Sequence, residues 1–175
     1  MTERRGTILT PGGWVRGQIT FGDRIEALTG APGEPEPPFL VPGFVDLHVH
    51  GGGGADVMQG EAAIRRTLRT HAAHGTTSLL ATTVTAPVED LDEALRAIGR
   101  VVAAPAADGA DLLGAHLEGP FLNPGRLGAQ PPFPRPADPA LLARWCATGL
   151  VRVVTLAPEI DPDGALADVL QAHGV

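Results

Sequence analysis

The chain of 175 residues contains a single cysteine, Cys146, and no lysine. One cysteine excludes an internal disulfide and is typical of proteins from a reducing compartment, so we expect a cytoplasmic location. Residues 1–14 carry charge but no apolar segment of the kind that a signal peptide needs. No uninterrupted apolar run approaches the length of a membrane span. We therefore expect neither a secretory signal nor a membrane anchor.

Positively charged residues are also fewer than negatively charged ones. The 13 arginines are outnumbered by 20 aspartates and glutamates, which gives a formal net charge of -7 at pH 7. This balance argues against nucleic acid and against an anionic membrane surface as partners. The hydrophobic fraction of 43% is typical of a globular protein that is long enough for one sizeable core.

Residues 1–40 have the pattern of short β-strands. Brief β-prone runs are interrupted by Pro-Gly and Gly-Asp breaks, and Gly30 to Pro38 is rich in proline, glycine and glutamate, which is typical of a loop. A segment of this size is too short to bury much surface by itself. We expect residues 1–40 to be part of a small β-sandwich domain.

From residue 41 the pattern changes to strand, loop and helix, repeated four times. The expected strands are Phe44–Val49, Thr76–Val84, Asp111–Glu118 and Val151–Leu156. The expected helices are Glu61–His74, Pro87–Ala103, Pro139–Ala147 and Gly164–His173. Four such units in series predict a parallel α/β architecture, and the apolar fourth strand is expected to be buried on both faces.

Two parallel architectures compete, an open doubly wound sheet and a closed barrel. No G-x-G-x-x-G fingerprint follows a strand in the proper context, whereas polar residues recur at the ends of different strands, as they do at the carboxyl face of β/α barrels. We therefore favour a TIM-type barrel. Four units do not close one, so residues 41–175 are expected to be the first four β/α units, the N-terminal half of a longer protein.

The stretch VPGFVDLHVHGGGG carries the first chemical signal. On a strand, Asp46, His48 and His50 share one face, and two imidazoles spaced by two residues can converge on one cation. The glycines that follow allow a sharp turn with little bulk nearby. The competing interpretation is a pair of histidines hydrogen-bonded in a core. The opposite face carries three apolar residues that we expect to be buried against a helix: Val45, Leu47 and Val49.

The stretch HLEGP carries the second signal, at the end of the third strand. Glu118 and His116 share a strand face there, and Gly119-Pro120 ends the pairing. Glu118 could supply the oxygen ligand that joins the two histidines, and it could bridge two cations. We expect His116 to orient the ligands or to be structural. The alternative is that Glu118 is a solvated loop acid.

Four segments, PGFVDLHVHGGGG, HGTTSLLATTV, GAHLEGPFLNP…GAQ and VTLAPE, resemble the N-acetylglucosamine-6-phosphate deacetylases of the amidohydrolase superfamily. The resemblance runs over nearly the whole chain, in the right order, and HLEGPF followed by LAPE is its most specific part. It implies a metal-dependent β/α barrel with a small β domain. It also implies hydrolysis of the acetamide of N-acetylglucosamine 6-phosphate, a small phosphorylated amino sugar, to glucosamine 6-phosphate and acetate.

The resemblance also implies roles for particular residues. Glu118 corresponds to the shared metal ligand, and His48 with His50 marks members that hold a second metal. Ala129 and Gln130 match loop positions that touch substrate, although some members carry histidine at the position of Gln130. We expect one or two divalent ions, zinc first, with iron or another divalent ion as the alternative, and a homodimer for the full-length protein.

The family's two later metal-binding histidines and its catalytic aspartate lie beyond the fourth unit. We therefore expect no catalytic residue within this chain and no activity from the chain alone. The three other histidines should lie at helix surfaces or ends: His71, His74 and His173. Two further hypotheses remain, another amidohydrolase of the dihydroorotase or cyclic-amide hydrolase type, and a non-catalytic metal-binding half-barrel.

Overall fold

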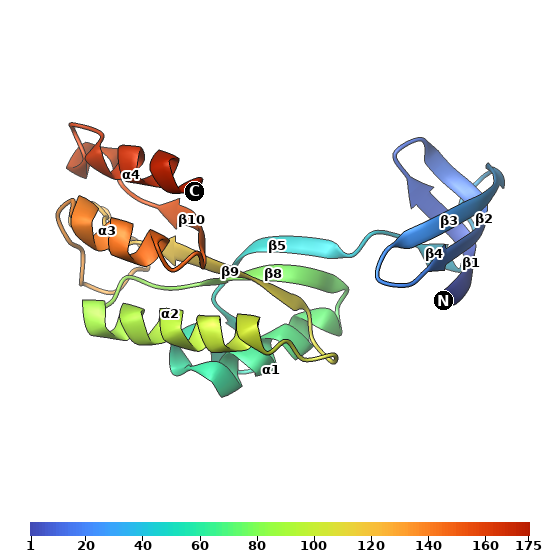
Figure 1. Ribbon diagram of the computed structural model, residues 1–175, viewed down its shortest axis with the longest axis horizontal. Coiled ribbons are helices and arrows are strands. Elements are labelled where there is room, and N and C mark those ends of the chain that lie inside the picture. Colours follow the sequence, from blue (N-terminus) through green and yellow to red (C-terminus); the bar gives the residue numbers. More distant parts are fainter. The chain divides into compact units, whose positions relative to one another are not determined.

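The computed structural model describes all residues from Met1 to Val175. It divides into two compact units, Met1–Gly43 and Phe44–Val175, which differ in their secondary structure (Figure 1). The first unit contains only strands, and the second alternates strands and helices along the chain.

The first unit is a four-stranded sheet with the order β3-β2-β1-β4. Its strands are β1 (Thr2–Thr10), β2 (Gly13–Phe21), β3 (Ile25–Pro32) and β4 (Phe39–Leu40). The expectation of a loop from Gly30 is partly wrong, because β3 continues to Pro32. Gly30 lies opposite Gly17 in the β2–β3 ladder, and a Cβ on either residue would collide with the facing backbone. Glycine therefore serves the close approach of two strands here rather than a loop.

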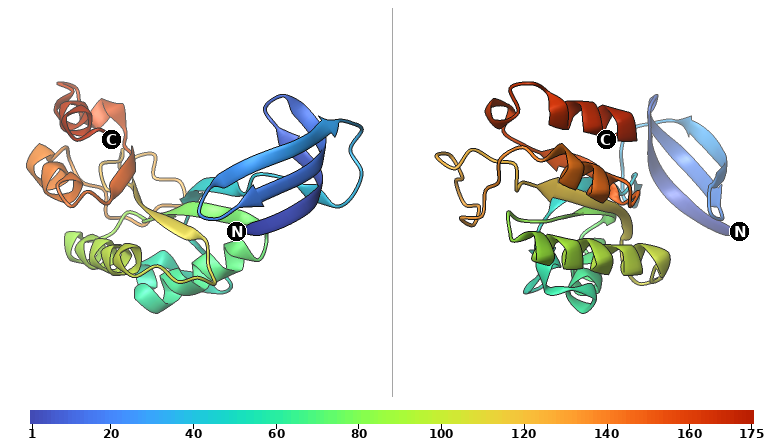
Figure 2. Two further views of the ribbon diagram at one scale, coloured as in Figure 1. Left: turned by 45° about the vertical axis from the view of Figure 1, so that its right-hand side comes forward. Right: turned by 60° about the vertical axis from the view of Figure 1, so that its left-hand side comes forward.

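The second unit is built on a curled, fully parallel sheet with the order β10-β9-β8-β5 (Figure 2). Its strands are β5 (Phe44–Val49), β8 (Thr76–Thr82), β9 (Asp111–Glu118) and β10 (Val151–Thr155). Each expected strand is present, and the bounds differ only at the carboxyl ends of β8 and β10. Consecutive strands are neighbours in the sheet, as they are in a β/α barrel, which has eight. The predicted α/β half-barrel is therefore confirmed.

Four helices connect and flank these strands. They are α1 (Glu61–Ala72), α2 (Val88–Ala103), α3 (Pro139–Cys146) and α4 (Ala165–His173). The shorter elements are β6 (Gly51–Gly52), β7 (Ala55–Asp56) and the 3-10 turns η1 (Val57–Gln59) and η2 (Pro158–Ile160). Helices α1 and α2 lie side by side along one face of the sheet, and α3 packs on α4 (Figure 1). None of the helices combines the length and the apolar character needed to cross a lipid bilayer.

The core of the second unit lies between its four helices and the sheet. Helix α2 presents Leu91, Leu95 and Ile98 at three- and four-residue spacing, and all three side chains are buried. They belong to one apolar cluster with Leu79 of β8 and Leu117 of β9. Burying side chains of this size contributes about 1.5–3 kcal/mol each. The cluster therefore fixes the helices against the strands whose ends carry the polar residues.

Two expectations about burial are wrong, and both concern the edges of the sheet. On β5 only Val49 is buried, whereas Val45 is 60% exposed and Leu47 is 53% exposed. On β10 Val151 is buried, but Arg152 and Thr155 are exposed. A strand is buried on both faces only where other elements cover both faces of the sheet. Strands β5 and β10 are the edge strands, and part of their surface has no such cover, so their apolar sequences do not lead to full burial.

Candidate metal centre

A glycine turn follows β5 and fixes the position of His50, the residue just after this strand. Gly53 and Gly54 both have positive φ, which lets the chain reverse between β6 and β7. The carbonyl of His50 accepts a hydrogen bond from the Val57 amide at 2.8 Å. His71 lies in the last turn of α1, as expected of a helix-end residue, and its Nε2 lies 3.0 Å from the Gly51 carbonyl oxygen. The His71 side chain thus connects this turn to α1.

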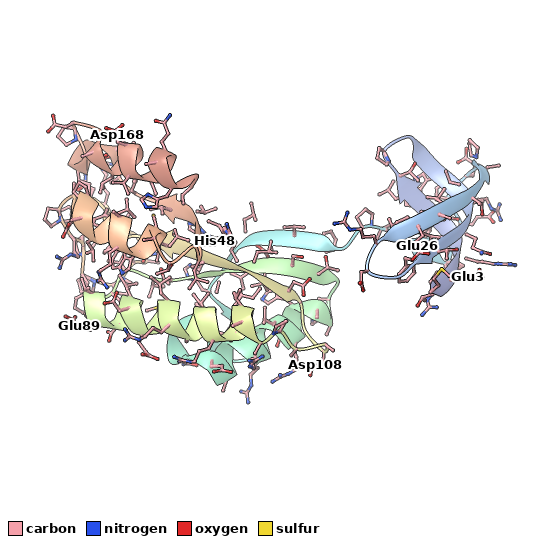
Figure 3. The ribbon with its side chains drawn as sticks, in the orientation of Figure 1. Glu3, Glu26, His48, Glu89, Asp108 and Asp168 are labelled. Atoms are coloured by element: carbon pink, nitrogen blue, oxygen red, sulfur yellow. The ribbon has the colours of Figure 1, made fainter.

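The side chains of His48, His50 and Glu118 converge at the carboxyl ends of β5 and β9. Glu118 Oε2 lies 2.9 Å from His50 Nε2 and 3.8 Å from His48 Nε2. The ligand atoms of the three residues all lie within 4.8 Å of one another. Figure 3 shows His48 near the end of β5. His48 on β5, His50 just after it and Glu118 at the end of β9, which is far from them in sequence, therefore form a compact group.

The hydrogen bonds around this group direct the Nε2 atom of His50 towards Glu118. His50 Nδ1 lies 3.0 Å from the Thr82 carbonyl oxygen, which can only accept, so this nitrogen carries the proton. In the neutral ring Nε2 then presents a lone pair, and it faces Glu118 Oε2, a buried oxygen with no hydrogen-bond donor. Two acceptors at this distance need a proton or a cation between them. The second imidazole, His48, completes a nitrogen–nitrogen–oxygen donor set that fits a divalent cation.

The last residue of β9 is held by the backbone around it. Gly119 has a φ of +82°, and a Cβ at this position would collide with Thr85 Oγ1. The Gly119 amide donates to the Thr155 carbonyl at 3.0 Å, and Thr85 Oγ1 lies 3.4 Å from the Glu118 carbonyl oxygen. The expected strand stop after Glu118 is therefore present, and it sets the carboxylate at the mouth of the half-barrel.

Gln130 is connected to Glu118 through the same threonine. Its side-chain oxygen accepts a hydrogen bond from the Thr85 amide at 2.7 Å. This bond fixes the orientation of the Gln130 amide and leaves its NH₂ group as a donor. Ala129 is exposed on the same loop, which runs between β9 and α3. The loop that holds both residues is thus joined to the end of β8 and, through Thr85, to the end of β9.

His116 lies beside the three converging residues but is not one of them. The residue is 5% exposed, and burial lowers the pKa of its imidazole, although the hydrogen bond to the Leu47 carbonyl opposes this shift. Nδ1 lies 3.2 Å from the Leu47 oxygen, and Nε2 lies 2.8 Å from Thr155 Oγ1. Both ring nitrogens are therefore occupied in the neutral form. Asp46 is also outside the group, because its Oδ1 accepts a hydrogen bond from the His48 amide at 3.1 Å.

The threonines at the strand ends are the main residues that the sequence analysis missed. Thr82 accepts at its carbonyl from His50, Thr85 connects Gln130 to Glu118, and Thr155 contacts His116. The available signal was position, since each threonine lies at or just after the end of a strand. Threonine is also common inside strands, so residue type and position did not distinguish these contacts.

The motifs HLEGPFLNP and LAPE meet in the structure through their polar residues. Asn123 Nδ2 donates to Glu159 Oε1 at 2.7 Å, and the Ala157 amide donates to the Phe121 carbonyl at 2.9 Å. The hydrogen bond from Asn123 is the main cause that lowers the pKa of Glu159. These contacts tie the loops after β9 and β10 together, beside the end of the sheet that carries Glu118.

The other two histidines, His74 and His173, also lie at helix ends, as expected. His74 Nδ1 lies 2.8 Å from the Thr70 carbonyl oxygen, and His173 Nδ1 lies 2.9 Å from that of Val169. Each imidazole thus satisfies a carbonyl in the last turn of its helix.

The strand order and the histidine-histidine-glutamate group define a class of protein. Residues 39–165 match the profile described as Amidohydrolase family, a range that includes the whole parallel sheet. The chain belongs to the amidohydrolase family.

Similar curated proteins narrow the comparison to sugar-phosphate deacetylases. The chain is 44% identical to the N-acetylglucosamine-6-phosphate deacetylase of Bacillus subtilis over 128 residues, which cover 70% of this chain and 32% of that protein. It is 37% identical to the N-acetylgalactosamine-6-phosphate deacetylase of Escherichia coli O157:H7 over 172 residues, which cover 93% of this chain and 45% of that protein. The chain therefore spans less than half the length of these two relatives.

Solved structures give the same result for the fold. The N-acetyl-D-glucosamine-6-phosphate deacetylase of Mycobacterium smegmatis superimposes with a TM-score of 0.79 at 39% identity, over 97% of this chain and 51% of that chain. A D267A mutant of the Mycobacterium smegmatis enzyme, solved in complex with N-acetyl-D-glucosamine-6-phosphate, gives a TM-score of 0.81 at 38% identity, over 97% of this chain and 46% of that chain. The Thermotoga maritima deacetylase gives 0.82 at 29% identity, over 97% of this chain and 46% of that chain.

Proposed function

We propose that the whole protein carrying this chain hydrolyses the acetamide of N-acetylglucosamine 6-phosphate to glucosamine 6-phosphate and acetate. The observation that carries the proposal is the convergence of His48, His50 and Glu118 in a chain whose similar relatives bear the names of sugar-phosphate deacetylases. The loops that carry the most specific motifs lie around the same end of the sheet.

We assign His48, His50 and Glu118 as ligands of one or two divalent ions. Imidazole nitrogens and a carboxylate oxygen suit zinc, with iron as the main alternative. A divalent cation supplies Lewis acidity, which polarises a carbonyl group and activates water. The role of Glu118 is to hold negative charge at the mouth of the half-barrel, and its buried Oε2 has no other partner. The role of the Thr82 carbonyl is to keep the His50 lone pair on Nε2.

We assign Gln130 and Ala129 to the substrate side of the site. Because the Gln130 side-chain oxygen accepts from the Thr85 amide, its NH₂ group is the part that can face a substrate oxygen. Ala129 beside it leaves room for a bulky ligand, since its side chain is one methyl group. Both positions are therefore assigned to contacts with the substrate.

The direct test is acetate release by the whole protein. We expect turnover of N-acetylglucosamine 6-phosphate that is lost on treatment with a chelator and restored by zinc. A protein that binds the metal but releases no acetate, while hydrolysing dihydroorotate or hydantoin, would assign it to another amidohydrolase activity. A protein that binds the metal and hydrolyses none of these substrates would support a non-catalytic role.

A second candidate substrate is N-acetylgalactosamine 6-phosphate. The Escherichia coli relative named for this sugar aligns with more of the chain than the Bacillus subtilis relative does. The two sugars differ in the configuration of one hydroxyl group, so kcat/KM values measured side by side distinguish them. We expect the glucosamine form to be preferred, and a preference for the galactosamine form would replace the first candidate with the second.

A further inference from the structure

The two histidines of the candidate site are held in different ways. His50 is anchored by its own ring, since Nδ1 contacts the Thr82 carbonyl at 3.0 Å. Neither ring nitrogen of His48 has a hydrogen-bond partner, and its side chain is 51% exposed. A ligand that is not oriented loses rotational freedom when it binds, which weakens binding. Something other than a ring hydrogen bond must therefore orient His48.

The backbone around His48 also lacks regular sheet pairing. The register between β5 and β8 shifts between Asp46 and Val49, so the ladder is interrupted at this point. Two side chains replace it. The Leu47 carbonyl, which belongs to the peptide group just before His48, lies 3.2 Å from His116 Nδ1. The Val49 amide, just after His48, donates to Thr82 Oγ1 at 2.9 Å.

His116 is itself held firmly and touches the His48 ring. The carbonyl of Leu47 can only accept, so Nδ1 of His116 donates, and the neutral ring accepts at Nε2 from the Thr155 hydroxyl at 2.8 Å. Its ring meets the His48 ring edge to face, with centroids 5.0 Å apart and an interplanar angle of 68°. The His116 side chain, rooted on β9, thus bridges β5 and β10.

We propose that His116, supported by Thr155, is a positioning residue that orients His48 for metal binding. His116 acts through its hydrogen bond to the Leu47 peptide group and through the contact of its ring with the His48 ring. His50 and Glu118 are held by other contacts, the Thr82 carbonyl and the backbone around Gly119. The inference rests on the proposed metal site. It predicts that His116 contributes to metal affinity only as long as His48 is present.

The test is a double-mutant cycle with Co²⁺ and Zn²⁺ as probes, read by the visible spectrum of bound Co²⁺ and by competition titration with Zn²⁺. His116→Phe keeps a ring against His48 but removes both nitrogens, and we expect the metal dissociation constant to rise by about 10- to 100-fold. Thr155→Val should raise it by a smaller factor. Thr77→Val is the matched control, since Thr77 Oγ1 contacts a carbonyl at the opposite end of β8, and it should leave affinity unchanged.

The decisive comparison is made in the His48→Ala background. There we expect His116→Phe to have no further effect on affinity, because both substitutions act through the same ligand. An equal loss with and without His48 would overturn the proposal, and so would unchanged affinity in both His116→Phe and Thr155→Val. If His116→Phe fails to fold, Thr155→Val carries the same cycle. If His48 is not a metal ligand at all, the unsubstituted protein and the His48→Ala variant bind Co²⁺ alike. This result differs from the two that overturn only the role of His116.

Discussion

At the scale of single residues, the charge of Glu118 is the most consequential feature of the candidate site. Its Oε2 is buried, faces His50 Nε2 at 2.9 Å and has no hydrogen-bond donor. Glu118→Gln keeps the shape and removes the charge. We expect this change to reduce kcat/KM by more than His48→Ala or His50→Ala does, and beyond the roughly 10- to 100-fold loss typical of residues that only support a ligand. Near-normal turnover by Glu118→Gln with the metal still bound would contradict the assignment.

A second residue-scale prediction concerns Asp92, away from the candidate site. Burial raises the pKa of Asp92, but hydrogen bonds from Trp145 and Arg144, together with the positive charges of Arg144 and Arg96, outweigh burial and hold this pKa below its ordinary value. A carboxyl group whose pKa is lower in the folded protein stabilises the fold above its ordinary pKa, and this contribution is lost as the pH falls through the folded value. We therefore expect Asp92→Asn to reduce the free energy of unfolding at pH 7 and to flatten its decline in acid.

The measurement for Asp92 is urea unfolding at several pH values. Asp92→Ala should cost more than Asp92→Asn, by about 1–3 kcal/mol, because it leaves the buried Trp145 Nε1 without its acceptor at 2.7 Å. Asp90→Asn, at an exposed position in the same helix, is the control and should change little. Equal effects of Asp90→Asn and Asp92→Asn would show that the buried pairing does not matter.

At the scale of elements, the end of β9 depends on one glycine. Gly119→Ala places a Cβ at a φ of +82°, which costs about 1–3 kcal/mol, and drives it into Thr85 Oγ1. Gly128→Ala is the matched control, since Gly128 also has positive φ, at +63°, but faces open space. We expect Gly119→Ala to lower both stability and metal affinity and Gly128→Ala to lower stability alone. Thermal unfolding and zinc titration of both variants measure this, and equal zinc affinity in the two would refute the role of the β9 stop.

The sequence predicted the bounds of the strands better than the burial of their side chains or the contacts between strands. The bounds of β9 were predicted to the residue, because a mostly apolar segment ends at Glu118, just before Gly119-Pro120. The exposure of Val45 and Leu47 was not predictable from β5 itself, since burial depends on whether another element covers that face. The site histidines were recognisable from spacing on one strand. The contacts of Thr82 and Thr155 were not, because they cross between strands and local pattern carries no information about cross-strand partners.

At the scale of the whole molecule, we predict that residues 1–175 expressed alone have no deacetylase activity. Within the chain no further histidine, cysteine or carboxylate joins the group of three. The exposed apolar residues of β5, an edge strand, are also expected to promote self-association. Acetate release with added zinc and sedimentation at two concentrations measure these properties. Chelator-sensitive turnover from a monomeric preparation would contradict both parts of the prediction.

The central claim is that His48, His50 and Glu118 hold a divalent metal, and the metal content of the purified whole protein tests it most directly. Elemental analysis should find less bound metal per chain in the double variant His48→Ala, His50→Ala than in the unsubstituted protein. A control double variant that changes the two helix-end histidines, His74→Ala with His173→Ala, should keep the full content. Equal metal content in all three proteins would contradict the claim.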